Sequence, residues 1–234
     1  MSKKHIFVQN LLSRKYLSES EMKDFVSELF GPEANADNII QYTKKKQIDY
    51  GLDLVKYIDQ VSGEGCWYLI NTKKDTLSAL STTFNQNEIV FIKLIIEAIM
   101  TNENNSFSIT YHEALRKANE VGVSTFKAKE AQKSLEKFAK EQWLESDKGR
   151  FLLGNRALCE LRVYLLDFYP EEILDCYVCN NIATKGFICG YCGKAIHTFC
   201  HTELSNEKNS GVCLNCNKDY DPTDSVIGLV VSSP

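Results

Sequence analysis

Apolar residues in the first eighty positions change from helical to strand-like spacing. Ser18 and Glu21 stand three positions apart at the start of one helical segment, which is the spacing of a capping box, and Asp37 is placed to cap the next segment. Residues 52–60 and 66–72 are rich in β-branched and aromatic side chains and flank a turn that contains glycine, which predicts a hairpin. The helices predicted before this hairpin span residues 5–14, 18–30 and 38–50.

Residues 86–153 repeat this order of elements. Isoleucines cover a broad face of the segment 87–100, too wide for a surface helix, so we expect this helix at the centre of a core. Residues 144–153 predict a second hairpin, and Ser124 is placed to cap the helix before it. Helices followed by a hairpin, twice over, predict tandem winged-helix domains, although the two halves share no close sequence repeat. The remaining elements are expected at 107–109 (extended), 111–119 (helix) and 124–141 (helix).

The rest of the chain divides into a helix, a cysteine-rich module and a tail. One amphipathic helix is predicted over 154–168, and Pro170 ends it. After Tyr220 the chain lacks periodicity, so we expect a flexible tail, with docking of the apolar segment 226–231 as the alternative. We therefore predict an α+β protein with winged-helix domains at 1–82 and 83–172, a RING-like zinc domain at 173–220 and a tail at 221–234.

Composition and charge exclude several classes of function. The 234 residues are 44% hydrophobic and carry a net charge of −4, which argues against DNA binding as a property of the whole chain. The longest apolar stretches contain charged residues and fall short of the ~20 residues that span a bilayer, so we expect no membrane association. The first twenty residues lack the pattern of a secretory signal, which favours metal binding over disulfides for the cysteines.

Eight potential metal ligands form four pairs, each with two residues between its members. This spacing lets both side chains of a tight turn reach one tetrahedral ion, with Zn–S distances of about 2.3 Å. Two pairs complete one site, so four pairs predict two Zn²⁺ ions. Protein atoms fill every ligand position, so these sites are structural and stabilise a module with few apolar residues. The predicted ligands are Cys176, Cys179, Cys189, Cys192, His197, Cys200, Cys213 and Cys216.

The ligand order is four cysteines, one histidine and three cysteines, and it resembles the cross-braced RING and PHD superfamily. That resemblance implies that the pairs interleave. His201 directly follows Cys200 and is an alternative ligand. The first implied site contains Cys176, Cys179, His197 and Cys200, and the second contains Cys189, Cys192, Cys213 and Cys216.

Residues between the ligands favour a RING domain over a PHD finger, but the RING pattern is incomplete. Val178 occupies the apolar position where RING domains contact a ubiquitin-conjugating enzyme (E2), whereas Leu214 stands where many active RING domains have proline. Asn217 follows the last ligand, where many have an activating arginine, and Gly211 replaces the aromatic residue usual in PHD fingers. We therefore predict E2 binding through Val178 and Leu214 with weak intrinsic activity; a histone-tail reader or an assembly scaffold is the alternative.

Four stretches outside the cysteine module carry a second resemblance. They read WYLIN at 67–71, NEIVF at 87–91, KEAQKSLEKF at 129–138 followed by QWL, and GNRAL at 154–158. Tandem winged helices followed by this ligand order are a rare combination. Together these features resemble the non-SMC element one family, the RING-like subunits of the SMC five–six complex.

That resemblance implies a nuclear, chromosome-associated protein of DNA repair and recombination. Such proteins pair with a MAGE-family subunit, join a kleisin subunit and are classed as ubiquitin ligases whose activity the MAGE partner aids. A RING-type ligase has no covalent catalytic residue of its own, because it positions a charged E2. The departures at Leu214 and Asn217 agree with such dependence on a partner.

Two surfaces are candidates for binding these partners or DNA. The N-terminal helix carries more apolar residues than one short helix usually buries, so we expect either contact with the MAGE partner or ordinary core packing. The third helix of a winged-helix domain usually enters the DNA major groove. In the second domain that helix mixes lysines with glutamates, as a solvated face does, so direct DNA contact is not favoured. The apolar residues of the N-terminal helix are Ile6, Phe7, Leu11 and Leu12.

Overall fold

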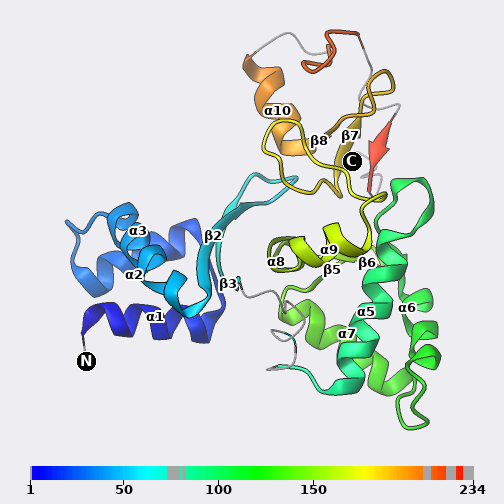
Figure 1. Cartoon of the computed structure of the whole chain (residues 1–234), viewed down its shortest axis with the longest axis horizontal. Helices are drawn as coiled ribbons and strands as arrows, with labels where there is room; N and C mark the ends of the chain where they lie inside the picture. The colour runs from blue at the N-terminus through cyan, green and yellow to red at the C-terminus, as the bar shows by residue number, and fades with distance from the viewer. Residues whose placement is uncertain (1, 73–79, 81–82, 208–211, 220–224, 229–234) are drawn as a thin grey trace. The chain divides into compact units, whose positions relative to one another are not determined.

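The chain forms two compact units in the computed structural model (Figure 1). No helix in the described part of the chain is long and apolar enough to cross a membrane. One unit comprises Met1–Asp59 and Gly63–Ala79, and the other comprises Gln60–Ser62 and Leu80–Pro234. The residues that the structure describes are 2–72, 80, 83–207, 212–219 and 225–228.

The first unit has the order of elements of a winged helix. Its strands form an antiparallel sheet in the order β1-β3-β2, with Leu17 opposite Trp67. Strand β1 is not predicted from the sequence, because three residues are too few for a periodic signal. The elements are α1 (Lys3–Arg14), β1 (Tyr16–Ser18), α2 (Glu19–Phe30), α3 (Ala36–Gln47), η1 (Ile48–Tyr50), β2 (Leu52–Ile58) and β3 (Gly65–Asn71).

Hydrogen bonds explain where two of these helices begin. The Ser18 amide donates to the Glu21 carboxylate at 2.8 Å, and the Glu21 amide donates to the Ser18 hydroxyl at 3.2 Å, so the predicted capping box is confirmed. The prediction for Asp37 is wrong. Asn35 caps α3 by accepting from the Asn38 amide at 3.0 Å, and Asp37 lies in the first turn, where a negative charge suits the helix dipole.

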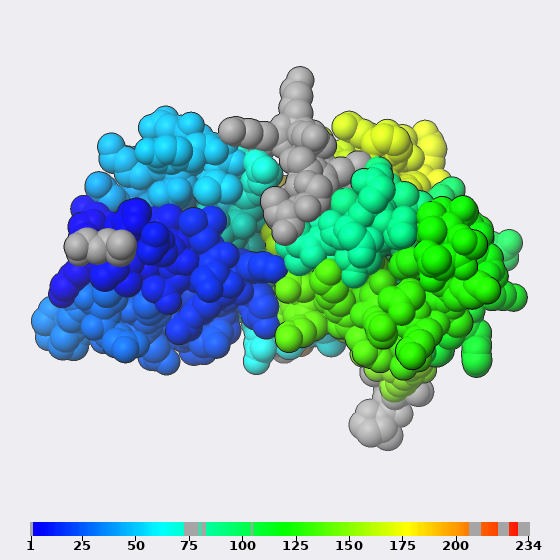
Figure 2. All heavy atoms as spheres, turned by 90° about the horizontal axis from the view of Figure 1, so that it is seen from below, coloured from blue at the N-terminus to red at the C-terminus, as the bar shows by residue number. Residues whose placement is uncertain are grey.

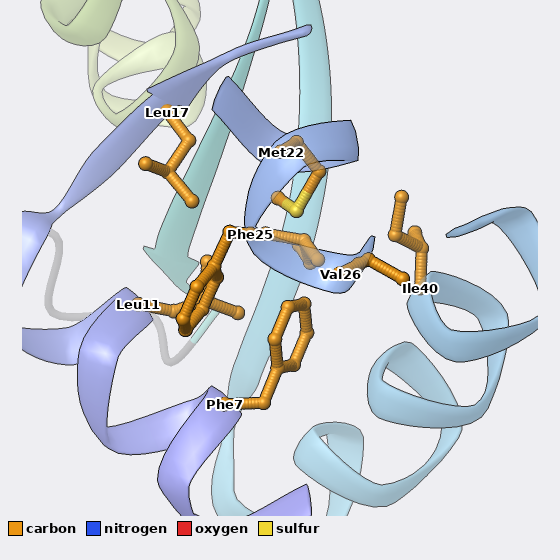
Figure 3. Close-up of a cluster of buried hydrophobic side chains, with 8 residues drawn as sticks. Phe7, Leu11, Leu17, Met22, Phe25, Val26 and Ile40 are labelled. Carbon is orange, nitrogen blue, oxygen red and sulfur yellow. The ribbon is translucent and has the colours of Figure 1, made fainter. Parts of the chain in front are cut away.

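The core of the first unit packs α1 against α2 (Figure 3). The ring of Phe7 is fully buried and stacks on Phe25 with 5.3 Å between centroids. Burial of each large apolar side chain contributes about 1.5–3 kcal/mol. Core packing therefore accounts for Phe7 and Leu11 of the N-terminal helix, whereas Leu12 stays half-exposed. The cluster consists of Phe7, Leu11, Leu17, Met22, Phe25, Val26, Ile40 and Leu54.

The second unit begins with the same order of elements. Its sheet order, β4-β6-β5, repeats β1-β3-β2, which confirms the predicted tandem winged-helix fold. Helices α5 to α7 form a continuous green surface in Figure 2. The elements are α5 (Gln86–Met100), η2 (Glu103–Asn105), β4 (Ile109–Thr110), α6 (Tyr111–Lys117), η3 (Ala118–Val121), α7 (Ala128–Lys140), β5 (Leu144–Asp147) and β6 (Arg150–Leu153).

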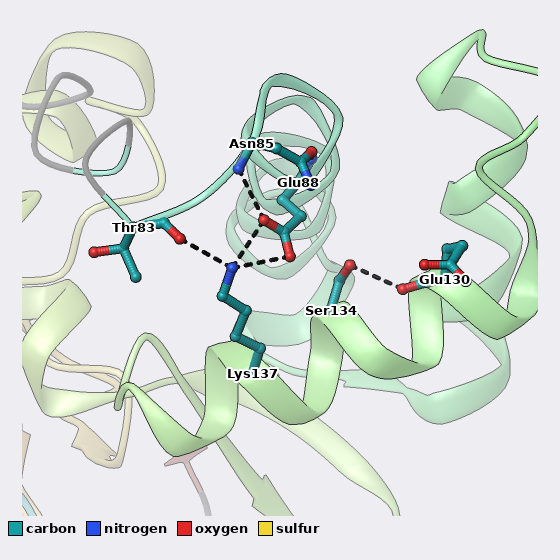
Figure 4. Close-up of polar contacts among 6 residues, drawn as sticks. All are labelled: Thr83, Asn85, Glu88, Glu130, Ser134 and Lys137. Atoms are coloured by element: carbon teal, nitrogen blue, oxygen red, sulfur yellow. Dashed lines mark hydrogen bonds and ion pairs between the residues drawn. The ribbon is translucent and has the colours of Figure 1, made fainter.

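Helix α5 is the central helix of this domain, as its isoleucines predict, and Ile95 and Ile99 are fully buried. Polar contacts hold its N-terminus (Figure 4). Glu88 completes a capping box with Asn85 and accepts from Lys137 of α7 at 3.0 Å. The same lysine donates to the Thr83 carbonyl at 2.9 Å, so α7 is fixed to the start of α5.

Helix α7 begins at Ala128, four residues later than predicted, so Ser124 does not cap it. The residues before α7 form a turn in which the Phe126 amide donates to the Val123 carbonyl at 3.0 Å. This turn buries the Phe126 ring with its centroid 5.1 Å from that of Phe91. Burial of an aromatic ring therefore overrides the cap that a serine offers.

Two helices lead into the cysteine module, which has its own small sheet. The single helix predicted over 154–168 is split at Leu161 into α8 (Asn155–Glu160) and α9 (Arg162–Phe168). The module's strands have the order β8-β7-β9. An ion pair of 2.6 Å between Lys185 and Glu145 of β5 joins the module to the second winged-helix domain. The module's elements are β7 (Gly186–Ile188), β8 (Ala195–His197), α10 (Thr198–Glu207) and β9 (Val226–Ile227).

Strand β9 lies within the segment expected to be a flexible tail. Ile227 is buried, and the Ile188 amide donates to the Ser225 carbonyl at 2.8 Å. Gly228 has φ of +82°, and a Cβ there would collide with the Thr184 carbonyl, so this position requires glycine. The expected flexibility is thus wrong for residues 225–228, which dock on the body of the protein. The rest of 221–234 lies outside the described residues.

Candidate metal centre

The predicted ligands of the cysteine module converge in two groups. Within each group the ligand atoms all lie within 4.8 Å of one another. The grouping is interleaved along the chain, as the resemblance to RING and PHD domains implies. The first group is Cys176, Cys179, His197 and Cys200, and the second is Cys189, Cys192, Cys213 and Cys216.

The spacing of these atoms fits tetrahedral zinc. Zn–S distances of about 2.3 Å place neighbouring sulfurs of a tetrahedron about 3.8 Å apart. In the second group, the Cys189 and Cys216 sulfurs are 3.8 Å apart, as are those of Cys192 and Cys213. In the first group, His197 Nδ1 lies 3.3 Å from the Cys179 sulfur and 3.7 Å from that of Cys200. The donor set and its spacing therefore support two zinc sites.

A backbone contact orients the histidine of the first site. His197 Nε2 lies 3.1 Å from the Ile182 carbonyl oxygen, to which it donates. This bond leaves Nδ1 to face the sulfurs as the ligand atom. Burial would lower the pKa of His197, but hydrogen bonds with the Cys176 and Cys179 sulfurs outweigh it and raise that pKa to about 10 in the absence of an ion.

Neighbouring thiols and burial shift the pKa values of the cysteines in each site. Hydrogen bonds from Cys179 and Cys200 lower the pKa of Cys176, whereas the interaction with Cys176 raises the pKa of Cys200. In the second site, burial raises the pKa of Cys213 to about 12. Several thiolates can lie this close together only when a cation offsets their negative charge. A metal ion supplies that charge and deprotonates the thiols that bind it. The electrostatics thus agree with the geometry.

The three Cys-x-x-Cys pairs share one backbone turn. The residue that follows each pair has a left-handed backbone, with φ of 58° at Asn180, 66° at Gly193 and 57° at Asn217. Its amide donates to the carbonyl of the first cysteine, at 2.8, 2.8 and 2.7 Å respectively. Glycine and asparagine adopt this conformation most readily. Asn217 therefore has a structural reason to replace the arginine found in many RING domains.

Among the described residues, the two remaining cysteines and His201 belong to neither group of metal ligands. His201, the alternative ligand, instead packs edge-on against Phe187 with 5.0 Å between ring centroids. Cys66 lies in β3, where burial raises the pKa of its thiol. Cys159 lies in α8 and is half-buried. Burial is the usual situation of a structural thiol.

The two predicted E2-binding residues lie in loops that meet. Val178 lies between the first ligand pair and is 41% exposed, and Leu214 lies between the last pair. Burial raises the pKa of the Tyr177 phenol to about 12, and the backbone of Leu214 lies near enough to oppose this rise. The first and last ligand loops are therefore neighbours. Tyr191 adds a further exposed aromatic surface, covered in part by the Lys218 ammonium at 4.9 Å from its centroid.

Comparison with known proteins identifies the family. A family model described as the Nse1 non-SMC component of the SMC5-6 complex matches residues 4–161. The chain belongs to the Nse1 family. The match covers both winged-helix domains and ends before the zinc module, so the resemblance predicted from sequence motifs is confirmed.

Nse1 proteins of distant organisms align with much of the chain. The Schizosaccharomyces pombe protein named non-structural maintenance of chromosomes element 1 is 25% identical over 223 residues, which cover 94% of this chain and 93% of that protein. The Homo sapiens homolog is 26% identical over 171 residues, which cover 73% of this chain and 63% of the human protein. The chain thus spans less than two thirds of the human protein's length.

A solved structure shows the same fold. A chain of a structure titled Nse1-Nse3-Nse4 complex superposes with a TM-score of 0.79 and 22% sequence identity. The superposition covers 94% of this chain and 97% of that chain, so it includes the zinc module as well as the winged helices.

Proposed function

We propose that this Nse1-family chain is a RING-type ubiquitin ligase subunit of an SMC5-6 complex, acting in DNA repair and recombination on nuclear chromosomes. The observation that carries the proposal is the pair of interleaved zinc sites, which hold the loop of the exposed Val178 beside the loop of the half-buried Leu214. Val178 and Leu214 of these loops would bind the E2. Catalysis would then consist of positioning, because every metal ligand position is filled by protein and no water is activated.

We propose further that activity depends on a MAGE-family partner, with a kleisin subunit completing the assembly. The solved Nse1-Nse3-Nse4 complex that shares this fold supports such an assembly. The departures from active RING domains at Leu214 and Asn217 support weak activity of the isolated chain. Direct DNA contact through α7 is not proposed, because Lys133 pairs with Glu130 at 3.1 Å and Lys137 pairs with Glu88 at 3.0 Å.

A ubiquitin-chain assay tests the ligase. The chain, with its zinc counted by mass spectrometry, is incubated with E1, a panel of E2 enzymes and ubiquitin, with and without its MAGE-family partner. We expect partner-stimulated chains that disappear in Val178→Glu. The matched control is Val163→Glu, because Val163 of α9 lies in the same unit and is 57% exposed but belongs to neither ligand loop. Equal activity of both variants would contradict the proposal.

The alternative is a structural or reader module without ligase activity. A histone-tail reader that adds a peptide strand to its sheet needs an open strand edge. Here one edge strand, β9, is only two residues long, and Ala195 of the other edge strand, β8, already forms a bridge with Cys176, which favours the ligase or a scaffold over such a reader. Two bound zincs without ubiquitin chains, for every E2 and with the partner present, would leave the scaffold as the function.

A further inference from the structure

Gln60 has a buried polar side chain, and it contacts residues that are distant from it in the sequence. It belongs to the same compact unit as the zinc module and is 2% exposed. Its side-chain oxygen accepts from the amides of Thr184 at 2.8 Å and Lys185 at 3.0 Å. Its side-chain nitrogen donates to the Thr184 hydroxyl at 3.0 Å, across a separation of 124 residues. A single amide group thus serves as acceptor and donor for one short segment.

The main chain of the same residue contacts a second segment. The carbonyl of Gln60 accepts from the Phe199 amide at 2.9 Å. Phe199 stands between two ligands of the first zinc site, His197 and Cys200. Gln60 therefore bonds simultaneously to the segment 184–185 and to the backbone between two metal ligands.

The segment 184–185 is also connected to the first zinc site by the pairing of β7 with β8. Gly186 follows it directly and pairs with His197 in the β7–β8 ladder. A Cβ at Gly186 would collide with the Ile196 carbonyl, so the two strands approach as closely as glycine allows. A shift of residues 184–185 therefore moves the backbone opposite His197.

We propose that Gln60 is a positioning residue of the first zinc site. It fixes the backbone at two places near His197. One is the segment 184–185, which precedes the strand β7 that pairs with His197, and the other is Phe199, two positions after His197. Buried amides require partners, and the Thr184 amide and hydroxyl find theirs in this one side chain. The second site receives none of the contacts described for Gln60, so its ligands serve as an internal reference.

The test replaces Gln60 by methionine, which keeps its length and volume but removes both polar atoms. Outer contacts that orient metal ligands are worth about 10- to 100-fold in metal affinity. We expect Gln60→Met to weaken the first site by that factor and to leave the second site unchanged. The matched control is Gln132→Met, because Gln132 lies on the exposed face of α7 in the same unit.

Cadmium-113 NMR of the full chain distinguishes the sites, because the first has three sulfurs and one nitrogen and the second has four sulfurs. With increasing chelator, the signal of the first site should be lost at lower concentration in Gln60→Met than in the parent chain and in Gln132→Met. Parallel loss of both signals would show a general loss of folding and overturn the proposal. An unchanged order and midpoint of loss would overturn it as well.

Discussion

Arg156 permits a quantitative test of how the second unit is stabilised, because its charge is buried. Its guanidinium donates to Glu160 at 2.8 Å and to the Glu141 carboxylate at 3.2 Å, and it lies 4.4 Å from the centroid of Trp143. The side chains of Arg156 and Glu160 are only 9% and 6% exposed. Arg156→Met keeps much of the packing volume but removes the cation that neutralises a carboxylate in this site.

The geometry sets the expected size of the effect. Removing one partner of a buried ion pair costs about 3–5 kcal/mol, whereas replacing both by apolar residues is often neutral. Arg156→Met should therefore lower the free energy of unfolding by about 3–5 kcal/mol. Adding Glu160→Met should recover most of this loss, except for about 0.5–2 kcal/mol from the lost contact with the Trp143 ring.

Urea denaturation followed by Trp143 fluorescence measures these free energies. The chain has two tryptophans, so Trp67→Phe in every variant makes the signal specific to the second unit. Arg162→Met is the matched control, since its pair with Asp175 is 36% and 47% exposed and should be worth up to about 1 kcal/mol. A loss of stability in Arg156→Met no larger than that in the control would refute the role of the buried charge. A double variant no more stable than Arg156→Met alone would refute it as well.

Three further predictions concern metal, pH and the C-terminal strand. A strong chelator should unfold the zinc module, since each structural zinc contributes about 10–16 kcal/mol in finger peptides; unchanged amide NMR signals at 175–219 would contradict this. Hydrogen bonds from Thr110 lower the pKa of Glu113, so its stabilisation of α6 is present above the unfolded pKa of about 4.3 and is lost as pH falls through the folded value. Denaturation at several pH values should show that the free energy of unfolding depends less on pH in Glu113→Gln than in the parent chain. An equal pH dependence in both would mean that Glu113 is not its source. Truncation after residue 224 should speed hydrogen exchange of the Ile188 amide, whereas truncation after Gly228 should not, and equal rates would contradict a role for β9.

Local signals in the sequence predict the elements whose cause is local. The capping box of Ser18 and Glu21 involves neighbouring residues, so its spacing alone identifies the start of α2. The isoleucines of α5 identify a central helix, because a wide apolar face is stable only when neighbours cover it. The Cys-x-x-Cys pairs identify metal sites, because the chemistry of each pair lies within one turn.

The elements that sequence analysis misses depend on distant residues. Helix α7 begins late because Phe126 packs against Phe91, a contact that no local pattern encodes. Strand β9 is only two residues long and forms because β7 offers it a partner. The role of Gln60 depends on Thr184, more than a hundred positions away. A polar residue in a turn gives no sign that it is buried, so only the folded structure places it beside the first zinc site.

The contacts of the zinc module limit how its variants are interpreted. Lys185 pairs with Glu145 of the second winged-helix domain, and the Gly228 amide donates to the Asn105 carbonyl of the same domain at 2.9 Å. Loss of a ligand such as Cys189 therefore disturbs the module and its contacts with a domain expected to take part in assembly. A defect in Cys189→Ala does not separate ubiquitin transfer from complex formation. Val178→Glu does separate them, because Val178 is exposed and is not a metal ligand, so normal assembly without ubiquitin chains would assign the defect to E2 recruitment.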